Sequence, residues 1–131
     1  MTCLHLLTDV VQKFPFSMAK NKSLRIRCWI DLDGKKFFGP GPAELLTHIE
    51  EFGSISEAAK KMKMSYKKAW DLINNINTQG QKPFVKLQKG GEKGGGATLT
   101  ATGIKMVAEY RLLTKKLNAI IEKNQDVLKW I

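Results

Sequence analysis

A run of polar and aromatic residues near the middle of the chain has side chains suited to binding nucleic acid rather than to catalysis. Asn74 can pair bidentately with adenine, and Lys67 can donate to guanine. Ser65 and the free backbone amides after it can hold a phosphate. Tyr66 and Trp70 offer flat apolar area with a hydrogen-bond donor; the alternatives are a surface aromatic and a core or hairpin-packing residue, respectively. The predicted DNA-binding residues of this run are Ser65, Tyr66, Lys67, Lys68, Trp70 and Asn74.

Two helices joined by a short turn are predicted to present this run. The first begins with Ser56 as its N-cap and carries Ala58 and Ala59, whose small side chains let crossing helices approach closely. Lys63-Met64 forms the turn, and Ser65 caps the second helix. The apolar period places four residues on the buried face of that second helix: Ala69, Leu72, Ile73 and Ile76. The predicted DNA-binding residues then lie on its outer face, with Lys68 near the edge.

A hairpin with a lysine- and glycine-rich tip follows. Residues 84–88 alternate as a strand, residues 89–96 form the tip, and residues 97–99 return. Lys86, Lys89 and Lys93 are predicted to hold the DNA backbone. The glycines lack the G-x-x-x-x-G-K-[ST] spacing of a nucleotide phosphate loop, so a DNA-contacting wing is the better interpretation. A helix-turn-helix followed by a basic hairpin is typical of a winged helix-turn-helix.

The preceding segment predicts a β-hairpin and one further helix. Apolar and basic residues alternate over 24–30, as in a half-buried strand, and Asp33-Gly34 is a strong turn signal before a second strand at 35–38. Pro42 suits the first position of a helix, and Gly53 suits its C-cap. The apolar face of this helix is predicted to comprise Leu45, Leu46, Ile49 and Phe52.

A last helix, capped by Thr100 or Thr102, is predicted to run to about residue 124. Its apolar stripe is too long for one small domain to cover, so we expect it to pair with a second copy; the alternative is a helix folded back on its own domain. The predicted dimerisation residues are Val107, Tyr110, Leu113, Leu117, Ile120 and Ile121.

These elements together predict a mainly α, α+β fold. The fold is a winged helix-turn-helix with an N-terminal β-hairpin and a long C-terminal dimerisation helix. Residues 1–22 are predicted to be an extension, either partly disordered or a short helix packed on the domain. Residues 23–100 form the DNA-binding domain, and residues 101–131 form the dimerisation helix.

Charge and composition favour an anionic partner. The chain of 131 residues has a net charge of +10 and an isoelectric point of about 9.7. Residues 54–96 hold nine lysines and three acids, a net charge of +6. More than half of the positive net charge of the chain therefore falls on the predicted DNA-binding elements. The alternative is a generally basic protein with solvated lysines.

The sequence lacks the residue patterns that enzymes, metal sites and membrane spans need. Cys3 and Cys28 have no metal-ligand spacing, and His5 and His48 stand alone. We therefore expect no enzyme activity, no metal and no cofactor. No apolar run approaches the roughly 20 residues of a membrane span, and a reducing, cytoplasmic location is expected.

The combined motifs resemble the N-terminal DNA-binding domain of the molybdate-responsive transcriptional regulators of the ModE family, relatives of the LysR-type winged helix. The resemblance covers about residues 23–124. The matching segments are the hairpin 25–38, Gly41-Pro-Ala-Glu-Leu-Leu46, Gly53-Ser-Ile-Ser56, Ala58-Ala59, Met64-Ser-Tyr-Lys67, Ala69-Trp-Asp71, Ile73-Asn74, the glycine-rich wing 90–97, Leu99-Thr100 and Gly103.

The resemblance implies a bacterial, cytoplasmic, homodimeric regulator that binds double-stranded DNA. In full-length members, molybdate-binding modules follow the helical segment. This chain ends at Ile131, so we expect no direct molybdate sensing. The alternative function is a winged-helix protein-interaction module without specific DNA binding, against which the excess of lysine argues.

Overall fold

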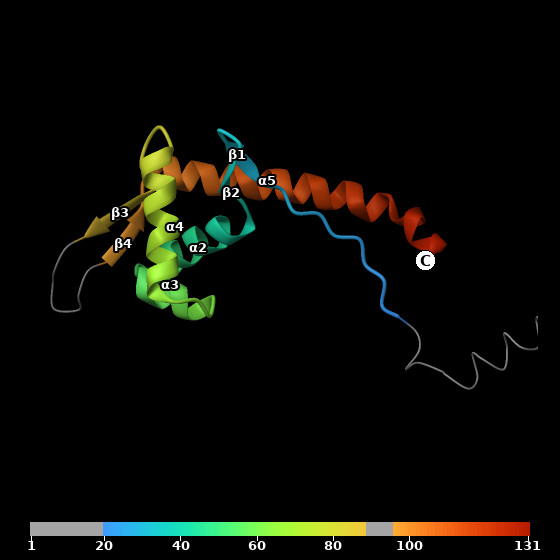
Figure 1. The fold of residues 1–131 in the computed structure, drawn as a ribbon, viewed down its shortest axis with the longest axis horizontal. Helices are drawn as coiled ribbons and strands as arrows, with labels where there is room; N and C mark the ends of the chain where they lie inside the picture. The colour runs from blue at the N-terminus through green and yellow to red at the C-terminus, as the bar shows by residue number, and fades with distance from the viewer. Residues whose placement is uncertain (1–19, 89–95) are drawn as a thin grey trace, which may run out of the picture.

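The computed structural model describes residues 20–88 and 96–131 (Figure 1). It is mainly helical, with two small hairpins and a long C-terminal helix, which confirms the predicted α+β class. In chain order the elements are β1 (Ile30–Leu32), β2 (Lys35–Phe38), α2 (Pro40–Phe52), α3 (Ile55–Lys61), α4 (Tyr66–Gln79), β3 (Val85–Gln88), β4 (Gly96–Leu99), α5 (Ala101–Lys123) and the 3-10 helix η2 (Gln125–Trp130). Both two-stranded sheets are antiparallel, β1 with β2 and β3 with β4.

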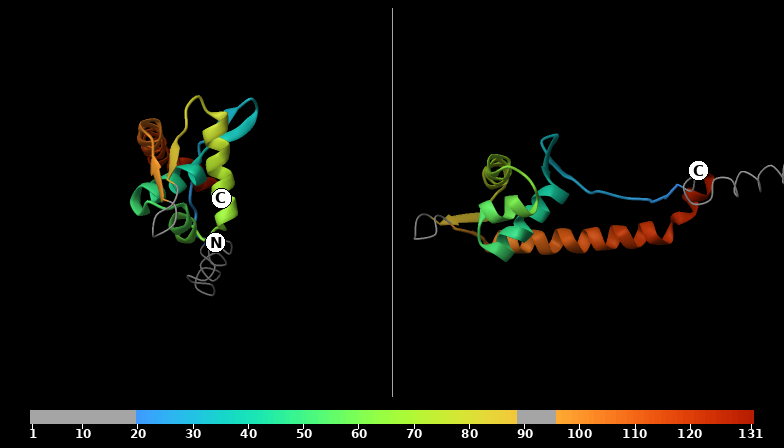
Figure 2. Two further views of the ribbon diagram at one scale, coloured as in Figure 1. Left: turned by 90° about the vertical axis from the view of Figure 1, so that its left-hand side faces the viewer. Right: turned by 90° about the horizontal axis from the view of Figure 1, so that it is seen from below.

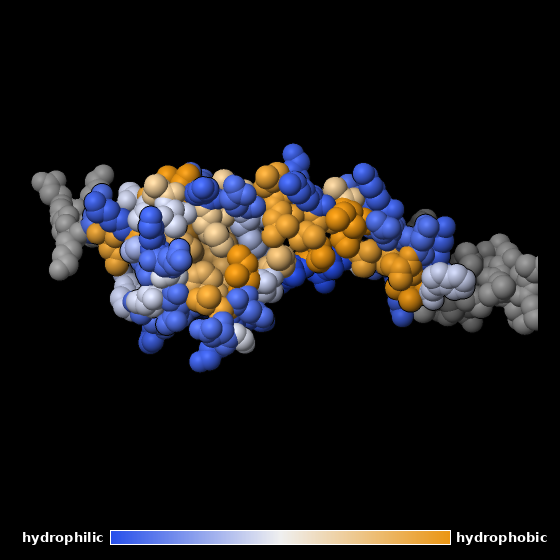
Figure 3. Space-filling view, turned by 90° about the horizontal axis from the view of Figure 1, so that it is seen from above, coloured by the Kyte–Doolittle hydropathy of each residue, from blue (hydrophilic) through white to orange (hydrophobic). Residues whose placement is uncertain are grey.

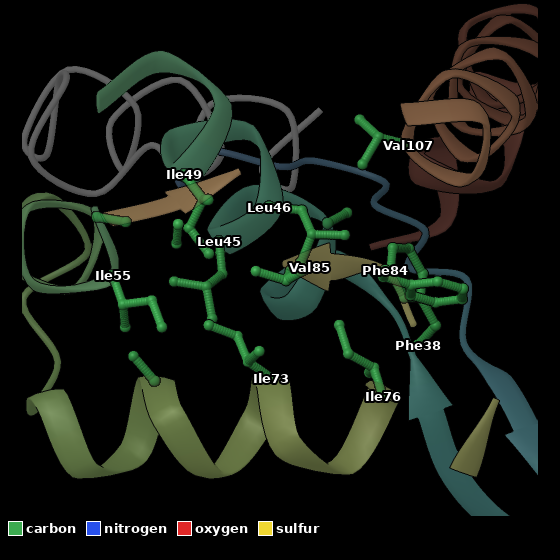
Figure 4. Close-up of a cluster of buried hydrophobic side chains, with 14 of the residues drawn as sticks. Phe38, Leu45, Leu46, Ile49, Ile55, Ile73, Ile76, Phe84, Val85 and Val107 are labelled. Atoms are coloured by element: carbon green, nitrogen blue, oxygen red, sulfur yellow. The ribbon is translucent and has the colours of Figure 1, made fainter. Parts of the chain in front are cut away.

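The core lies between α2, α4 and the first turns of α5 (Figure 4). Ile73 and Ile76 of α4 point toward Leu45 and Leu46 of α2, and all four are almost completely buried. An edge-on aromatic chain continues the core, with ring centroids 6.1 Å apart for Phe38 and Phe84 and 5.2 Å apart for Phe38 and Tyr110. The core therefore joins both hairpins to the helices.

Three predicted helix ends are confirmed. Gly53 ends α2 in the left-handed region at φ 67°, with its N–H donating to Ile49 O at 2.7 Å. The Ser65 hydroxyl accepts from the Lys68 N–H at 3.1 Å, and the Thr100 hydroxyl accepts from the Gly103 N–H at 3.0 Å. Each cap satisfies a backbone group that the helix itself leaves unpaired.

Gly103 also sets how closely α5 approaches the second hairpin. A Cβ at this position would lie 2.1 Å from the carbonyl oxygen of Phe84. A larger residue would therefore push α5 away from the segment that leads into β3.

Four expectations for the N-terminal half are wrong. Residues 24–29 form no strand: β2 has four residues before Gly39 and the helix that follows, so only Ile30–Leu32 has a partner. Helix α2 begins at Pro40 rather than Pro42, and its last residue, Phe52, is 42% exposed rather than on the buried face. Ser54 rather than Ser56 caps α3, because the turn at Gly53 already leaves Ile55 helical, and the Ser54 hydroxyl accepts from the Glu57 N–H at 3.2 Å.

Helix α5 extends well beyond the other elements (Figure 1). Its first turns pack in the core, whereas apolar side chains gather on the surface where it leaves the domain (Figure 3). No helix in residues 20–88 or 96–131 is long and apolar enough to cross a membrane.

Candidate nucleic-acid interface

Helices α3 and α4 cross closely because their contact is built from alanine. Ala58 and Ala59 of α3 and Ala69 of α4 are all fully or almost fully buried. In the turn between the helices, Lys63 takes φ 55° and the Met64 N–H donates to Ala59 O at 3.0 Å. This fixed turn sets the direction in which α4 presents its outer face.

The outer face of α4 brings together the residues predicted from the sequence. Tyr66 is 55% exposed and Trp70 is 40% exposed, so neither is a core residue. The remaining members of the set are exposed as well: Ser65, Lys67, Lys68 and Asn74. The helix therefore carries aromatic area, positive charge and a free amide on one accessible surface.

Asp71 is a partner of Lys67 that the sequence interpretation missed. The Lys67 ammonium donates to the Asp71 carboxylate at 3.0 Å, across one helical turn. An i, i+4 spacing of opposite charges is a signal that could have identified the pair. Both side chains are more than half exposed, and such pairs contribute roughly 0–1 kcal/mol. Lys67 can therefore exchange this carboxylate for another acceptor at little cost.

The second hairpin is fastened to α4 by Asn77, which the sequence interpretation also missed. The Asn77 carbonyl accepts from the N–H groups of Phe84 and Val85 at 2.8 and 3.1 Å, and its amide donates to Val85 O at 2.9 Å. No local pattern in the sequence distinguishes Asn77 from the exposed Asn74. The three bonds set where β3 begins relative to the outer face of α4.

The rest of the hairpin base is held from two other directions. The Ala97 N–H donates to Gly53 O at 3.0 Å, and the Thr100 N–H donates to Phe84 O at 2.9 Å. The Thr100 hydroxyl donates to Pro83 O at 2.7 Å. These bonds tie β4 to the end of α2 and tie α5 to the start of β3.

Of the lysines predicted on this hairpin, Lys86 is exposed on β3, where it lies opposite Thr98. Lys89 and Lys93 lie outside the described residues. Tyr66 borders a shallow surface pocket with Leu87 and Gln88, so the start of α4 and strand β3 form one surface.

The residues of the predicted dimerisation stripe fall into two groups. Val107 and Tyr110 are only 3% and 7% exposed and belong to the core of their own domain. Leu113 and Ile120 are exposed, whereas Leu117 and Ile121 are half-buried. The uncovered part of the predicted stripe therefore begins at Leu113.

Tyr110 also holds the extended N-terminal segment against α5. Its hydroxyl donates to Cys28 O at 2.7 Å. Burial raises the pKa of Tyr110 above the ordinary value of 10.0, nearby Cys28 raises it further, and the neighbouring Thr114 side chain offsets part of this rise. The tyrosine is therefore a neutral, structural group.

The described residues contain no cluster of three or more His, Cys, Asp or Glu side chains that could hold a metal ion. His48 stacks on Phe52 with a centroid distance of 6.0 Å. Cys28 is a free, half-buried thiol.

The exposed basic helix, its fixed turn and the adjacent hairpin form a surface of the kind that binds nucleic acid. No family model matches the chain. The chain is 41% identical over 99 residues to the DNA-binding transcriptional dual regulator ModE of Escherichia coli K12, a match covering 76% of this chain and 36% of that protein. It is 36% identical over 94 residues to the transcriptional regulator ModE of Haemophilus influenzae, covering 72% and 37%.

A third relative, the molybdenum-pterin-binding protein MopB of Rhodobacter capsulatus, is 46% identical over 86 residues, covering 63% of this chain and 32% of that protein. The chain is homologous to the N-terminal region of the ModE transcriptional regulators, which confirms the resemblance found in its motifs. The match spans about a third of the length of these relatives.

Proposed function

We propose that the chain is a transcriptional regulator of the ModE type that binds duplex DNA with the outer face of α4. The observation that carries the proposal is that Tyr66, Lys67, Trp70 and Asn74 share one exposed helix surface. The similarity to ModE includes this region and independently suggests the same function.

In the proposed complex, α4 enters the major groove. Asn74 and Lys67 read base edges, because amide and ammonium groups pair with adenine and guanine there. Lys67 leaves Asp71 to do so, an exchange between exposed partners. Ser65, Lys68 and the first amides of α4 hold a phosphate at the positive end of the helix.

The proposed winged helix-turn-helix consists of α3, α4 and the β3–β4 hairpin. The bonds of Asn77 hold the hairpin beside α4, so the hairpin can follow the DNA backbone where α4 enters the groove. Lys86 serves as a phosphate contact from β3, and Lys89 and Lys93 serve from the tip. Phosphate contacts of this kind position a protein without reading sequence.

We propose a homodimer formed through the projecting part of α5. Leu113, Leu117, Ile120 and Ile121 form the surface that a second copy covers. Residues 23–100 act as the DNA-binding unit, with the first turns of α5 completing its core. Two recognition helices then contact half-sites about one DNA turn, or a multiple of it, apart.

The metal-related name of one relative belongs to a protein about three times as long as the match. The expectation that molybdate does not act directly on this chain stays an untested prediction.

Fluorescence anisotropy with labelled random duplex DNA, over a series of salt concentrations, tests the proposal. Each neutralised phosphate contributes about −0.9 to the slope of log affinity against log salt, so a steep negative slope is expected. A slope near zero would contradict DNA binding and favour the protein-interaction module instead.

A further inference from the structure

The β1–β2 hairpin lies beside the C-terminal end of α4, on the edge away from the β3–β4 hairpin. Phe37 of β2 packs there, so close that a Cβ at Gly80 would lie 3.3 Å from its ring. Lys35 and Lys36 of the hairpin line one polar surface pocket together with Asn75 and Gln79 of α4. The pocket is therefore continuous with the exposed surface of α4.

The hairpin and α4 also face the same way. Figure 2 shows, in its right-hand view, the hairpin tip and α4 on one side of the molecule and α5 on the opposite side. A duplex lying against α4 is thus on the side to which the hairpin projects.

The length of α4 determines what its two ends meet. Its 14 residues span about 21 Å, whereas the major groove is about 12 Å wide. Placed across the groove, a helix of this length extends past both of its edges. Tyr66, at the first end, adjoins β3, and Gln79, at the other end, adjoins β1–β2.

We propose that the β1–β2 hairpin is a second phosphate-binding element, with Lys35 and Lys36 contacting the DNA strand opposite the one held by the β3–β4 hairpin. This inference rests on the proposed DNA binding by α4. The two hairpins then hold the two edges of the groove that α4 enters.

The charges of the hairpin support this role. Both lysines are exposed, and neither forms an ion pair with any residue in the described ranges 20–88 and 96–131. Lys36 is oriented by the Trp29 ring, with its ammonium 4.8 Å from the ring centroid. A lysine held by a neutral ring keeps its charge available for a phosphate.

Two acids lie on the same hairpin, and one of them gives a sensitive test. Asp31 lies opposite Lys36 in the strand pair. Asp33 forms the turn with Gly34, at φ 52° and 78°, and lines the same pocket as the lysines. The Asp33 carboxylate would repel a DNA phosphate bound nearby, because both groups are negatively charged. Asn suits this turn as well as Asp does, so Asp33→Asn removes the charge without changing the turn.

The test compares the salt dependence of duplex binding for Lys35→Gln/Lys36→Gln and for Lys115→Gln/Lys116→Gln, a matched pair of adjacent exposed lysines on α5. The hairpin variant is expected to make the negative slope of log affinity against log salt shallower by about 1–2. The α5 variant is expected to leave the slope near the wild-type value. Asp33→Asn is expected to raise affinity at low salt.

Equal slopes for the two double variants, or an unchanged affinity of Asp33→Asn, would overturn the role of the hairpin while α4 still binds DNA. Wild-type protein without salt-dependent binding would instead overturn the proposed function itself.

Discussion

Asn74 and Lys67 are the side chains to which we assign base recognition. Asn74→Ala and Lys67→Ala should each reduce discrimination between the preferred site and a site changed at one base pair, by roughly 1–3 kcal/mol. Lys86→Ala should weaken binding to both sites equally, because phosphate contacts carry no sequence information. Competition anisotropy with the two duplexes measures the difference. If Lys86→Ala changed discrimination and the α4 variants did not, the assigned roles would be reversed.

Tyr110 provides a prediction about pH. Its raised pKa means that the fold favours the neutral hydroxyl. That stabilisation is fully present below the ordinary pKa of about 10 and is lost as pH rises through the higher pKa of the folded state. Tyr110→Phe, which removes the bond to Cys28 O, should lower the free energy of unfolding at neutral pH by about 0.5–1.5 kcal/mol.

Above pH 10 the gap between wild type and Tyr110→Phe should narrow, because only the wild type loses stability by ionisation there. Urea unfolding at neutral and alkaline pH measures both effects. Tyr66→Phe is the matched control, since Tyr66 is exposed and should change neither value. A gap that widened at alkaline pH would contradict the buried, neutral state of Tyr110.

Within single elements, the sequence predicted correctly the features that depend only on neighbouring residues. Ser65 as a cap, Gly53 as a C-cap and the buried alanine pair are all confirmed, since each depends on a few neighbouring residues. The prediction of a strand over residues 24–29 was wrong because a strand needs a partner, and the partner β2 is too short to pair with these residues. The role of Asn77 depends on a contact across a loop, which its own neighbours do not encode.

Asn77 should therefore control the attachment of the β3–β4 hairpin. Asn77→Ala removes three hydrogen bonds to the backbone of Phe84 and Val85 and should lower the free energy of unfolding by about 2–3 kcal/mol. Asn74→Ala, three residues earlier on the exposed face, should change it by no more than about 0.5 kcal/mol. Urea denaturation of both variants provides the comparison, and equal stabilities would show that Asn77 does not hold the hairpin.

For the whole molecule, the division of the α5 stripe determines how dimerisation can be tested. Truncating the chain after Lys105 would remove Val107 and Tyr110 from the core, so unfolding would be confused with loss of the dimer. Substitutions in the projecting part avoid this problem. Leu117→Gln/Ile120→Gln places two polar groups in the uncovered surface, where Ile120 is 56% exposed in the single chain.

Leu117→Gln/Ile120→Gln should give a folded monomer. The two polar side chains break up the exposed apolar patch whose burial would stabilise the dimer. Binding to a two-half-site operator should fall by about 10²-fold or more as the linked second contact is lost, while binding to one half-site should change little. Ala119→Gln is the matched control, since the 3.6-residue period places it on the opposite face of α5. Sedimentation velocity at tens of micromolar reports the mass. A wild-type chain that sediments as a monomer would contradict the proposed homodimer. The expectation of a palindromic operator would then have no basis.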